Sequence, residues 1–301
     1  MAYKILVITA EVGESQLNDA IKSVKDQLNV EVEHVIISNK PTLVAEKEIY
    51  MTAFKHKEHF DYIARLDGDM VLKSITALYS MSNLLDLHPN ICRLSVPVHD
   101  FYTNEQIQGF HIMRSSGIPK QVEVNEYKPE KWIEELPSKT IRTLKSPLVL
   151  HGHNPNLDQA IRFGLHRGLK ALKTGPRSTH WRTINALRVN LRLESKLNPI
   201  SANTYKLKIA YVSILLVLGS YSKKTFNWEA VNFDSITNKE VKKSINNILD
   251  TRYDHSKDTS IHTFISLHYA SFNSYYESIR IIISIYYNKY KSKYFRVARM
   301  I

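Results

Sequence analysis

The first hundred residues alternate short apolar runs with amphipathic stretches. The apolar runs cover residues 4–9, 32–38, 62–66 and 91–98, and the stretches with helical spacing cover residues 15–29, 43–57 and 74–87. Strands that alternate with helices of this length are typical of a mainly parallel sheet with helices on both faces. The sequence therefore predicts an α/β, Rossmann-like fold for this part of the chain.

Two carboxylates, Asp67 and Asp69, stand where the third apolar run ends. A strand buried on both faces does not hold them in its interior, so we expect them at its carboxyl end, where open α/β sheets bind ligands. Hard oxygen donors suit Mn²⁺ or Mg²⁺, and such an ion commonly completes its shell with phosphate oxygens. Gly68 between them is expected to let the backbone turn so that both side chains face one point. The triplet is common by chance, and its position at a strand end gives it weight.

The ends of the first two predicted strands should lie along the same edge as this pair of carboxylates. A nucleotide spanning that edge would meet residues from all three strand ends. The candidate donor-binding residues are Thr9, Ala10, Glu11, Asn39, Arg65, Asp67, Gly68 and Asp69. The chain has neither a G-x-G-x-x-G after its first strand nor a G-x-x-x-x-G-K-[ST], which argues against a dinucleotide enzyme and a P-loop ATPase.

A second informative stretch contains His151 and His153 at the end of a short apolar run. We expect these two rings to alternate across the end of the strand, so that one points inward and one away. Imidazole is a good ligand for Mn²⁺, so both are candidate metal ligands beside Asp67 and Asp69. Asn154 is predicted to cap the helix that follows.

Charge and composition favour an anionic partner. The 301 residues carry a formal net charge of +12, and nine Lys or Arg but one acid lie between residues 162 and 196. Such a belt fits a diphosphate or the head groups of an anionic membrane surface. Cys92 is the only cysteine, so we expect a reducing compartment. With no signal-peptide pattern and no long apolar run, the expected location is the cytoplasm, or the inner face of the plasma membrane as a peripheral protein.

The pattern changes in the C-terminal part. Residues 179–301 are predicted to form a mainly helical appendage that contacts the acceptor, a membrane surface or a second copy in a homo-oligomer. Residues 207–218 are strongly apolar, and residues 279–296 combine apolar, tyrosine and basic residues. The expected division is thus a catalytic domain over 1–178 and this appendage.

Over residues 3–175 the chain resembles the GT-A fold glycosyltransferases, particularly bacterial family 2 enzymes of surface polysaccharide assembly. The resemblance rests on Asp67-Gly-Asp69 after a strand, a later strand over residues 109–114 and the His151-Gly-His153 segment. It implies that Asp69 binds Mn²⁺ or Mg²⁺, that Asp67 lies near the ribose and sugar of the donor, and that His151 or His153 reaches the metal or diphosphate. The implied activity is hexosyl transfer from a nucleotide-sugar to a glycan or lipid-linked acceptor in polysaccharide or lipopolysaccharide synthesis.

The chain departs from that family at the catalytic base. The family's Glu-Asp pair, expected about 25 residues before the first histidine, does not occur. Glu126 and Glu130 lie in that window, and Asp100 ends the strand before it, so these three are the candidate bases. Inverting stereochemistry is implied by the resemblance alone.

Two other function classes remain open at this point. A sugar nucleotidyltransferase also uses an α/β sheet with paired acids, but the loop after the first strand, residues 9–14, has one glycine and no basic residue. A basic nucleic-acid-binding module is supported by the net charge alone, because the chain has no helix-turn-helix, zinc-finger or RNA-recognition signature.

Overall fold

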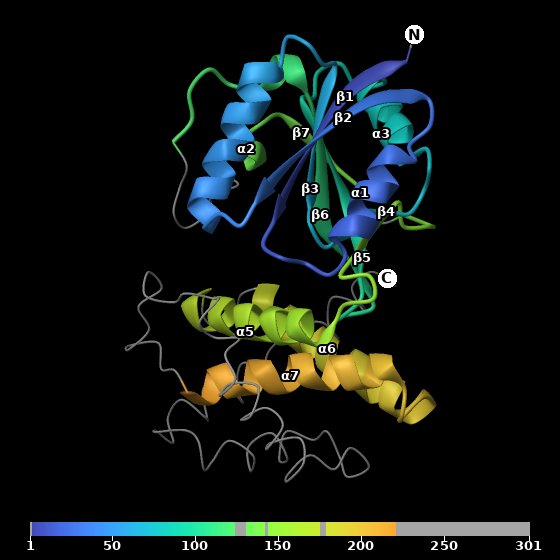
Figure 1. Cartoon of the computed structure of the whole chain (residues 1–301), viewed down its shortest axis with the longest axis vertical. Helices are drawn as coiled ribbons and strands as arrows, with labels where there is room; N and C mark the ends of the chain where they lie inside the picture. The colour runs from blue at the N-terminus through green and yellow to red at the C-terminus, as the bar shows by residue number, and fades with distance from the viewer. Residues whose placement is uncertain (1, 124–130, 142–143, 175–178, 221–301) are drawn as a thin grey trace, which may run out of the picture. The chain divides into compact units, whose positions relative to one another are not determined.

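The computed structural model describes residues 2–123, 131–141, 144–174 and 179–220, and it divides into two compact units (Figure 1). The first unit contains residues up to 101 together with 105–154. The second contains residues 102–104 and those from 155 onward.

The first unit is α/β. In chain order its elements are β1 (Tyr3–Glu11), α1 (Leu17–Lys25), β2 (Val30–Ser38), α2 (Thr42–His56), β3 (Tyr62–Asp67), β4 (Met70–Leu72), α3 (Ala77–Asp86), β5 (Arg93–Asp100), β6 (Glu105–Arg114), the 3-10 helix η1 (Ser115–Gly117), α4 (Lys131–Glu134), β7 (Ser138–Thr140) and β8 (Val149–His151). The alternation predicted from the apolar runs is confirmed for β1, β2, β3 and the helices between them.

The strands form one mixed sheet in the order β2-β1-β3-β6-β5-β8-β4, with β7 paired to β5. Among the described strands, β1 pairs in parallel with β2 and β3, and β5 pairs in parallel with β7 and β8. Strand β6 is antiparallel to β3 and β5, and β4 is antiparallel to β8. Residues 101–104 join β5 to β6, and so short a connection cannot make the crossover that a parallel pair needs.

Helices cover both faces of this sheet (Figure 1). Along β1, Ile5 and Val7 pack with α1 and α3, whereas Leu6 and Ile8 pack with α2 and α4. A strand buried on both sides reads as a continuous apolar run, which is why the sequence pattern located β1. Each fully buried aliphatic side chain of this kind contributes about 1.5–3 kcal/mol.

Strand β4 was not predicted, and it changes how the Asp-Gly-Asp stretch is built. Its three residues follow β3 directly and pair with β8, so that Met70 lies opposite His151. The amide of Gly152 donates to the carbonyl oxygen of Asp69 at 2.9 Å. The backbone therefore holds two segments far apart in sequence, around Asp69 and His151, side by side.

The second unit is helical and contains α5 (Leu157–Thr174), α6 (Thr179–Leu197) and α7 (Ala202–Ser220). Helix α5 packs closely on α7, because a Cβ at Gly164 would lie 2.2 Å from the carbonyl oxygen of Ala210. Tyr102 stacks on Phe163 with 3.7 Å between the ring centroids. Whereas we expected a boundary at residue 178, α5 groups with α6 and α7, and the units divide after Asn154.

Asn154 does not cap α5 as predicted. It adopts a left-handed conformation with φ 48°, and the helix begins three residues later. Asn156 makes the cap instead, since its Oδ1 accepts the amide of Gln159 at 2.8 Å. No helix within residues 2–123, 131–141, 144–174 and 179–220 is long and apolar enough to cross a membrane.

Candidate functional site

The carboxyl ends of β1 and β3 meet at one edge of the sheet, as predicted. Asp67 lies opposite Ala10 in the parallel ladder, and the amide of Gly68 donates to the carbonyl oxygen of Ala10 at 3.0 Å. Gly68 is required for space and not for a left-handed backbone, which only Gly13 and Gly152 adopt among the described glycines. A Cβ on Gly68 would lie 2.8 Å from Glu11 Cβ and 2.9 Å from a carboxylate oxygen of Glu14.

His151 lies between two carboxylates in the first unit. Its Nδ1 donates to Oδ1 of Asp100 at 2.6 Å, and its Nε2 is 3.4 Å from Oδ2 of Asp69. Asp100 pairs with His151 in the ladder between β5 and β8, and its side chain is 0% exposed. Because Asp100 holds Nδ1, the second ring nitrogen is directed at Asp69.

The electrostatics of this cluster favour positive charge. Burial alone lowers the pKa of His151, but the charges of Asp69 and Asp100 outweigh it and raise this pKa to about 9. Burial raises the pKa of Asp69, and the nearby charges of Asp67 and Asp100 add to this, while His151 opposes it. The carboxylates therefore repel one another and stabilise a cation between them.

Glu14 belongs to the same edge and was missed by the sequence analysis. Burial raises the pKa of Glu14, and the charges of Asp69 and Glu11 raise it further. Its Oε2 accepts the amide of Val12 at 2.7 Å. The sequence feature that could have identified Glu14 is its spacing from Glu11 across the turn that follows β1.

The predicted donor-binding residues of β1 and β2 differ in how accessible they are. Thr9 is fully buried, and its hydroxyl hydrogen-bonds to Nε2 of His34 at 2.8 Å. Glu11 is also buried, and its carboxylate accepts the amide of Gly13 at 2.7 Å. Ala10 is half-buried, and Asn39 is exposed at the end of β2. Of this group, Asn39 and Ala10 can meet a ligand, whereas Thr9 serves the interior.

Arg65 lies on the face of the sheet that α2 covers. Its guanidinium binds both carboxylate oxygens of the buried Glu46, at 2.5 and 3.0 Å, and its Nε is 3.4 Å from Oδ1 of Asp67. The half-exposed Asp67 is therefore held in place by the guanidinium of Arg65, which is itself bound to Glu46 of α2.

A polar row continues from Arg65 across the sheet to His111 and Arg93. His111 lies opposite Arg65 in the ladder between β3 and β6, and its Nδ1 is 3.3 Å from Nη1 of Arg93. Burial lowers the pKa of His111 to about 4, and the charges of Arg93 and Arg65 act in the same direction. The ring is therefore neutral at pH 7 and accepts from Arg93.

The two histidines of the predicted pair take different positions. His151 joins Asp69 and Asp100, whereas His153 is exposed beyond the left-handed Gly152, whose φ is 62°. Of the two histidines predicted as metal ligands, only His151 lies beside the carboxylates.

Of the three candidate bases, the structure describes Asp100 alone. Asp100 has no exposed surface and its carboxylate is bonded to His151, so it has no direct path to an acceptor hydroxyl. Its contact with His151 fits a residue that positions the ring. Glu126 and Glu130 lie outside the described residues.

Asp69 and His151 could be two ligands of a divalent ion that shares its shell with a phosphorylated ligand. Two ligands of an octahedral ion with bonds of about 2.1 Å lie about 3 Å apart, close to the 3.4 Å between Asp69 and His151. A carboxylate on the far nitrogen of a metal-binding histidine, like that of Asp100, fixes the ring and raises its basicity. Within the described residues no group of three or more His, Cys, Asp or Glu could hold a metal by itself. A metal held here would take its remaining ligands from phosphate and water.

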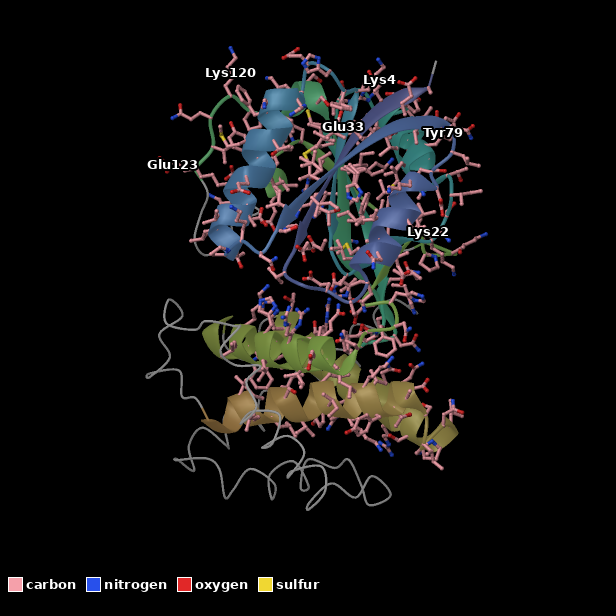
Figure 2. The ribbon with its side chains drawn as sticks, viewed as in Figure 1. Lys4, Lys22, Glu33, Tyr79, Lys120 and Glu123 are labelled. Atoms are coloured by element: carbon pink, nitrogen blue, oxygen red, sulfur yellow. The ribbon has the colours of Figure 1, made fainter. Side chains whose placement is uncertain are left out.

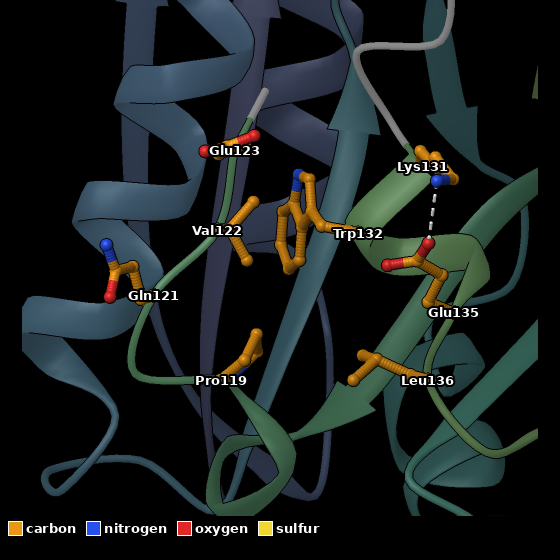
Figure 3. A pocket seen from close by; sticks show the side chains of 8 residues that line it. All are labelled: Pro119, Gln121, Val122, Glu123, Lys131, Trp132, Glu135 and Leu136. Carbon is orange, nitrogen blue, oxygen red and sulfur yellow. Dashed lines mark ion pairs between the residues drawn. The ribbon is translucent and has the colours of Figure 1, made fainter. Parts of the chain in front are cut away.

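A cavity of about 480 Å³ lies elsewhere in the first unit, between residues 119–123 and α4 (Figure 3). Val122 and Pro119 face the indole of Trp132, which packs edge-on against Tyr50 with ring centroids 5.5 Å apart. Among the described residues, none of those predicted for the site lines this cavity, and it is distinct from the edge that carries Asp69.

Comparison with known proteins gives no family for this chain. No protein-family model matches it, and no curated protein matches it. Among solved structures it is similar to A197 from STIV, with 14% sequence identity and a TM-score of 0.35, covering 46% of this chain and 81% of A197.

Proposed function

We propose that the chain is a metal-dependent glycosyltransferase that uses a nucleoside-diphosphate sugar as donor. The observation that carries the proposal is the array of the partly exposed Asp69 and His151 with the buried Asp100 at the carboxyl edge of the sheet. It combines two metal ligands, a carboxylate that orients one of them, and an edge at which α/β sheets bind nucleotides.

The chemistry of sugar transfer fits this site. Negative charge develops on the diphosphate as it departs from the sugar, and a divalent ion supplies Lewis-acid stabilisation of that charge. Asp69 and His151 would hold the ion, and Asp100 keeps Nε2 of the ring in place. Asp67, fixed by Arg65 and half-exposed, would receive the ribose or the sugar.

Gly68 carries no side chain, and the space that a Cβ would need there is filled by Glu11 and Glu14. The hydrogen bond from the amide of Gly68 to the carbonyl oxygen of Ala10 holds the turn against the end of β1. Asn39, exposed at the end of β2, is the residue we assign to the base or ribose of the donor.

The finer assignment to the GT-A fold is part of this proposal. It is supported by the parallel set β2-β1-β3, by the Asp-Gly-Asp turn directly after β3, and by helices on both faces of the sheet. The acceptor is a glycan or a lipid-linked glycan of polysaccharide or lipopolysaccharide synthesis. Glu126 or Glu130 would supply the base of an inverting hexosyl transfer.

The test is thermal unfolding of the full chain with uridine, guanosine, cytidine and thymidine diphosphate, each with Mn²⁺ and with chelator. A ligand at a hundred times its Kd stabilises the folded state by about 2.7 kcal/mol, which raises Tm by about 5–11 °C for a unit of this size. We expect one nucleotide to raise Tm only with Mn²⁺, and Asp69→Ala to remove the rise.

The matched control is Asp19→Ala, which removes an exposed carboxylate from α1 and should keep the full rise. A rise that persists in chelator or in Asp69→Ala would refute the metal site. Activity is then tested by transfer of radiolabelled sugar from the nucleotide-sugar whose nucleotide binds.

A further inference from the structure

Helix α6 exposes an apolar stripe. Val189, Leu193 and Leu197 follow one another at intervals of four residues, and they are 46%, 53% and 73% exposed. Ile200, three residues beyond Leu197, is 96% exposed. Residues four apart lie on one side of a helix, so Val189, Leu193 and Leu197 form a single surface, and Ile200 lies in the turn beyond the end of the helix.

The opposite side of α6 is anchored in the second unit. Its buried residues are Trp181, Ile184, Ala186, Leu187, Asn190 and Leu191. The indole of Trp181 donates to the carbonyl oxygen of Ala171 at 3.2 Å, and Asn190 donates to that of Tyr102 at 3.0 Å. Helix α6 therefore already has a packed face, and the exposed stripe is a second one.

Cations flank the stripe. Arg182, Arg192 and Lys196 are exposed, and each lies three, four or seven residues from an apolar residue of the stripe. The one acid of α6, Glu194, follows Leu193 and so lies about 100° around the helix from it. Leucines between basic residues are typical of helices that lie in a membrane interface. There the aliphatic part of each Lys or Arg side chain is buried and its charged end contacts the lipid head groups.

We propose that this surface, the α6 face, docks the protein on an anionic membrane. It comprises Arg182, Val189, Arg192, Leu193, Lys196, Leu197 and Ile200. The inference uses no residue of the carboxylate site and does not depend on glycosyl transfer.

Charge selects this partner over the chain's own C-terminal part. Residues 221–301 contain thirteen Lys or Arg and seven Asp or Glu, so they are themselves positively charged. The cations of the α6 face are complementary to an anionic surface, and its exposed leucines fit acyl chains better than the phosphates of a nucleic acid.

The experiment measures sedimentation of the full chain with vesicles of phosphatidylcholine alone and of phosphatidylcholine with a third of phosphatidylglycerol, without nucleotide or metal. We expect binding to the anionic vesicles that weakens strongly between ~0.1 and ~1 M salt. Each basic residue near an anionic surface contributes about 1 kcal/mol, so Arg192→Glu with Lys196→Glu should weaken binding about 30-fold or more. Leu193→Ser with Leu197→Ser should weaken it about tenfold or more.

Matched controls lie on the first unit. Lys22→Glu with Lys25→Glu changes the net charge equally on the exposed side of α1, where Lys22 points outward (Figure 2). Leu28→Ser with Leu87→Ser removes two other exposed leucines. Both control proteins should bind as the wild type does.

Three results would overturn the proposal. One is a wild type that sediments equally with both kinds of vesicle or with neither. Another is undiminished binding in both α6 variants. The third is a wild-type dimer that the leucine variant dissociates in analytical ultracentrifugation, which would assign the face to a second copy of the chain.

Discussion

Asp100→Asn tests whether His151 is oriented to bind metal. The carboxylate of Asp100 is fully buried and accepts from Nδ1 of His151 at 2.6 Å. The amide has the same shape and can still accept this bond, but it removes the charge. A hydrogen bond to a charged group contributes about 1.5–3 kcal/mol and a neutral one about 0.5–1.5 kcal/mol. The difference, about 1–2 kcal/mol, agrees with the typical loss when such a supporting residue is changed.

We therefore expect the Kd for Mn²⁺ to rise about 10-fold to 100-fold in Asp100→Asn. The assay is titration of Mn²⁺ followed by electron paramagnetic resonance, in the presence of the nucleoside diphosphate that stabilises the wild type. Asp69→Ala should lose binding altogether because it removes a ligand.

The control is Asp86→Asn, which removes a carboxylate that Tyr3 and Arg114 bind, at 2.8 and 3.1 Å, away from His151. It should keep the wild-type Kd. Unchanged Mn²⁺ affinity in a folded Asp100→Asn protein would refute the assignment of Asp100 as the residue that positions the ring.

The other predictions concern the histidines and the helical unit. His151→Ala should abolish the Mn²⁺-dependent rise in Tm, and His153→Ala should leave it intact; equal effects would contradict the division of roles. His111 has a pKa of about 4 in the fold, below its usual 6.5, so its contribution to stability is present above pH 6.5 and is lost as pH falls toward 4. The free energy of unfolding, measured in urea at pH 6.5 and at pH 4, should fall by about 3 kcal/mol more in the wild type than in His111→Gln. Gly164→Ala places a Cβ 2.2 Å from the carbonyl oxygen of Ala210 and should destabilise the second unit by about 1–3 kcal/mol in the same assay, against a gain of about 1 kcal/mol if the site were open.

The elements that the sequence predicted are those with a local cause. Strand β1 is buried on both faces, which leaves a continuous apolar run that needs no knowledge of its neighbours. The position of Asp67 and Asp69 at a strand end follows from the same reasoning. Strand β4 has only three residues, Met70–Leu72, too few to show a period, and its pairing with β8 depends on a segment about eighty residues away.

That pairing decides the site, so the site was predicted only in part. The sequence named Asp69 and His151 but could not choose between His151 and His153, because the choice depends on which ring the β8 ladder turns toward Asp69. Asp100 was a candidate base on the strength of ending a strand. Its burial and its bond to His151 exist only once β5 and β8 are adjacent, and these make it a positioning residue.

The helical boundary illustrates the same distinction. The extent of the resemblance and the change of pattern beyond it suggested that the first unit continues as far as residue 178. Its packing is set instead by the small residues Gly164 and Gly168, which meet Ala210 and Val217 of α7. Such complementarity between two helices is not visible in either helix alone.

The ladder between β4 and β8 also bears on the entropy of ligand binding. Asp69 and His151 are attached to backbone segments already joined by hydrogen bonds, including that from Gly152 to Asp69. A ligand arriving at this edge does not have to order a loop to gather them. The conformational entropy that a mobile site would lose on binding is lost here when the protein folds, and it does not weaken the affinity for the ligand. The affinity at this edge can therefore reflect the contacts between the protein and the ligand.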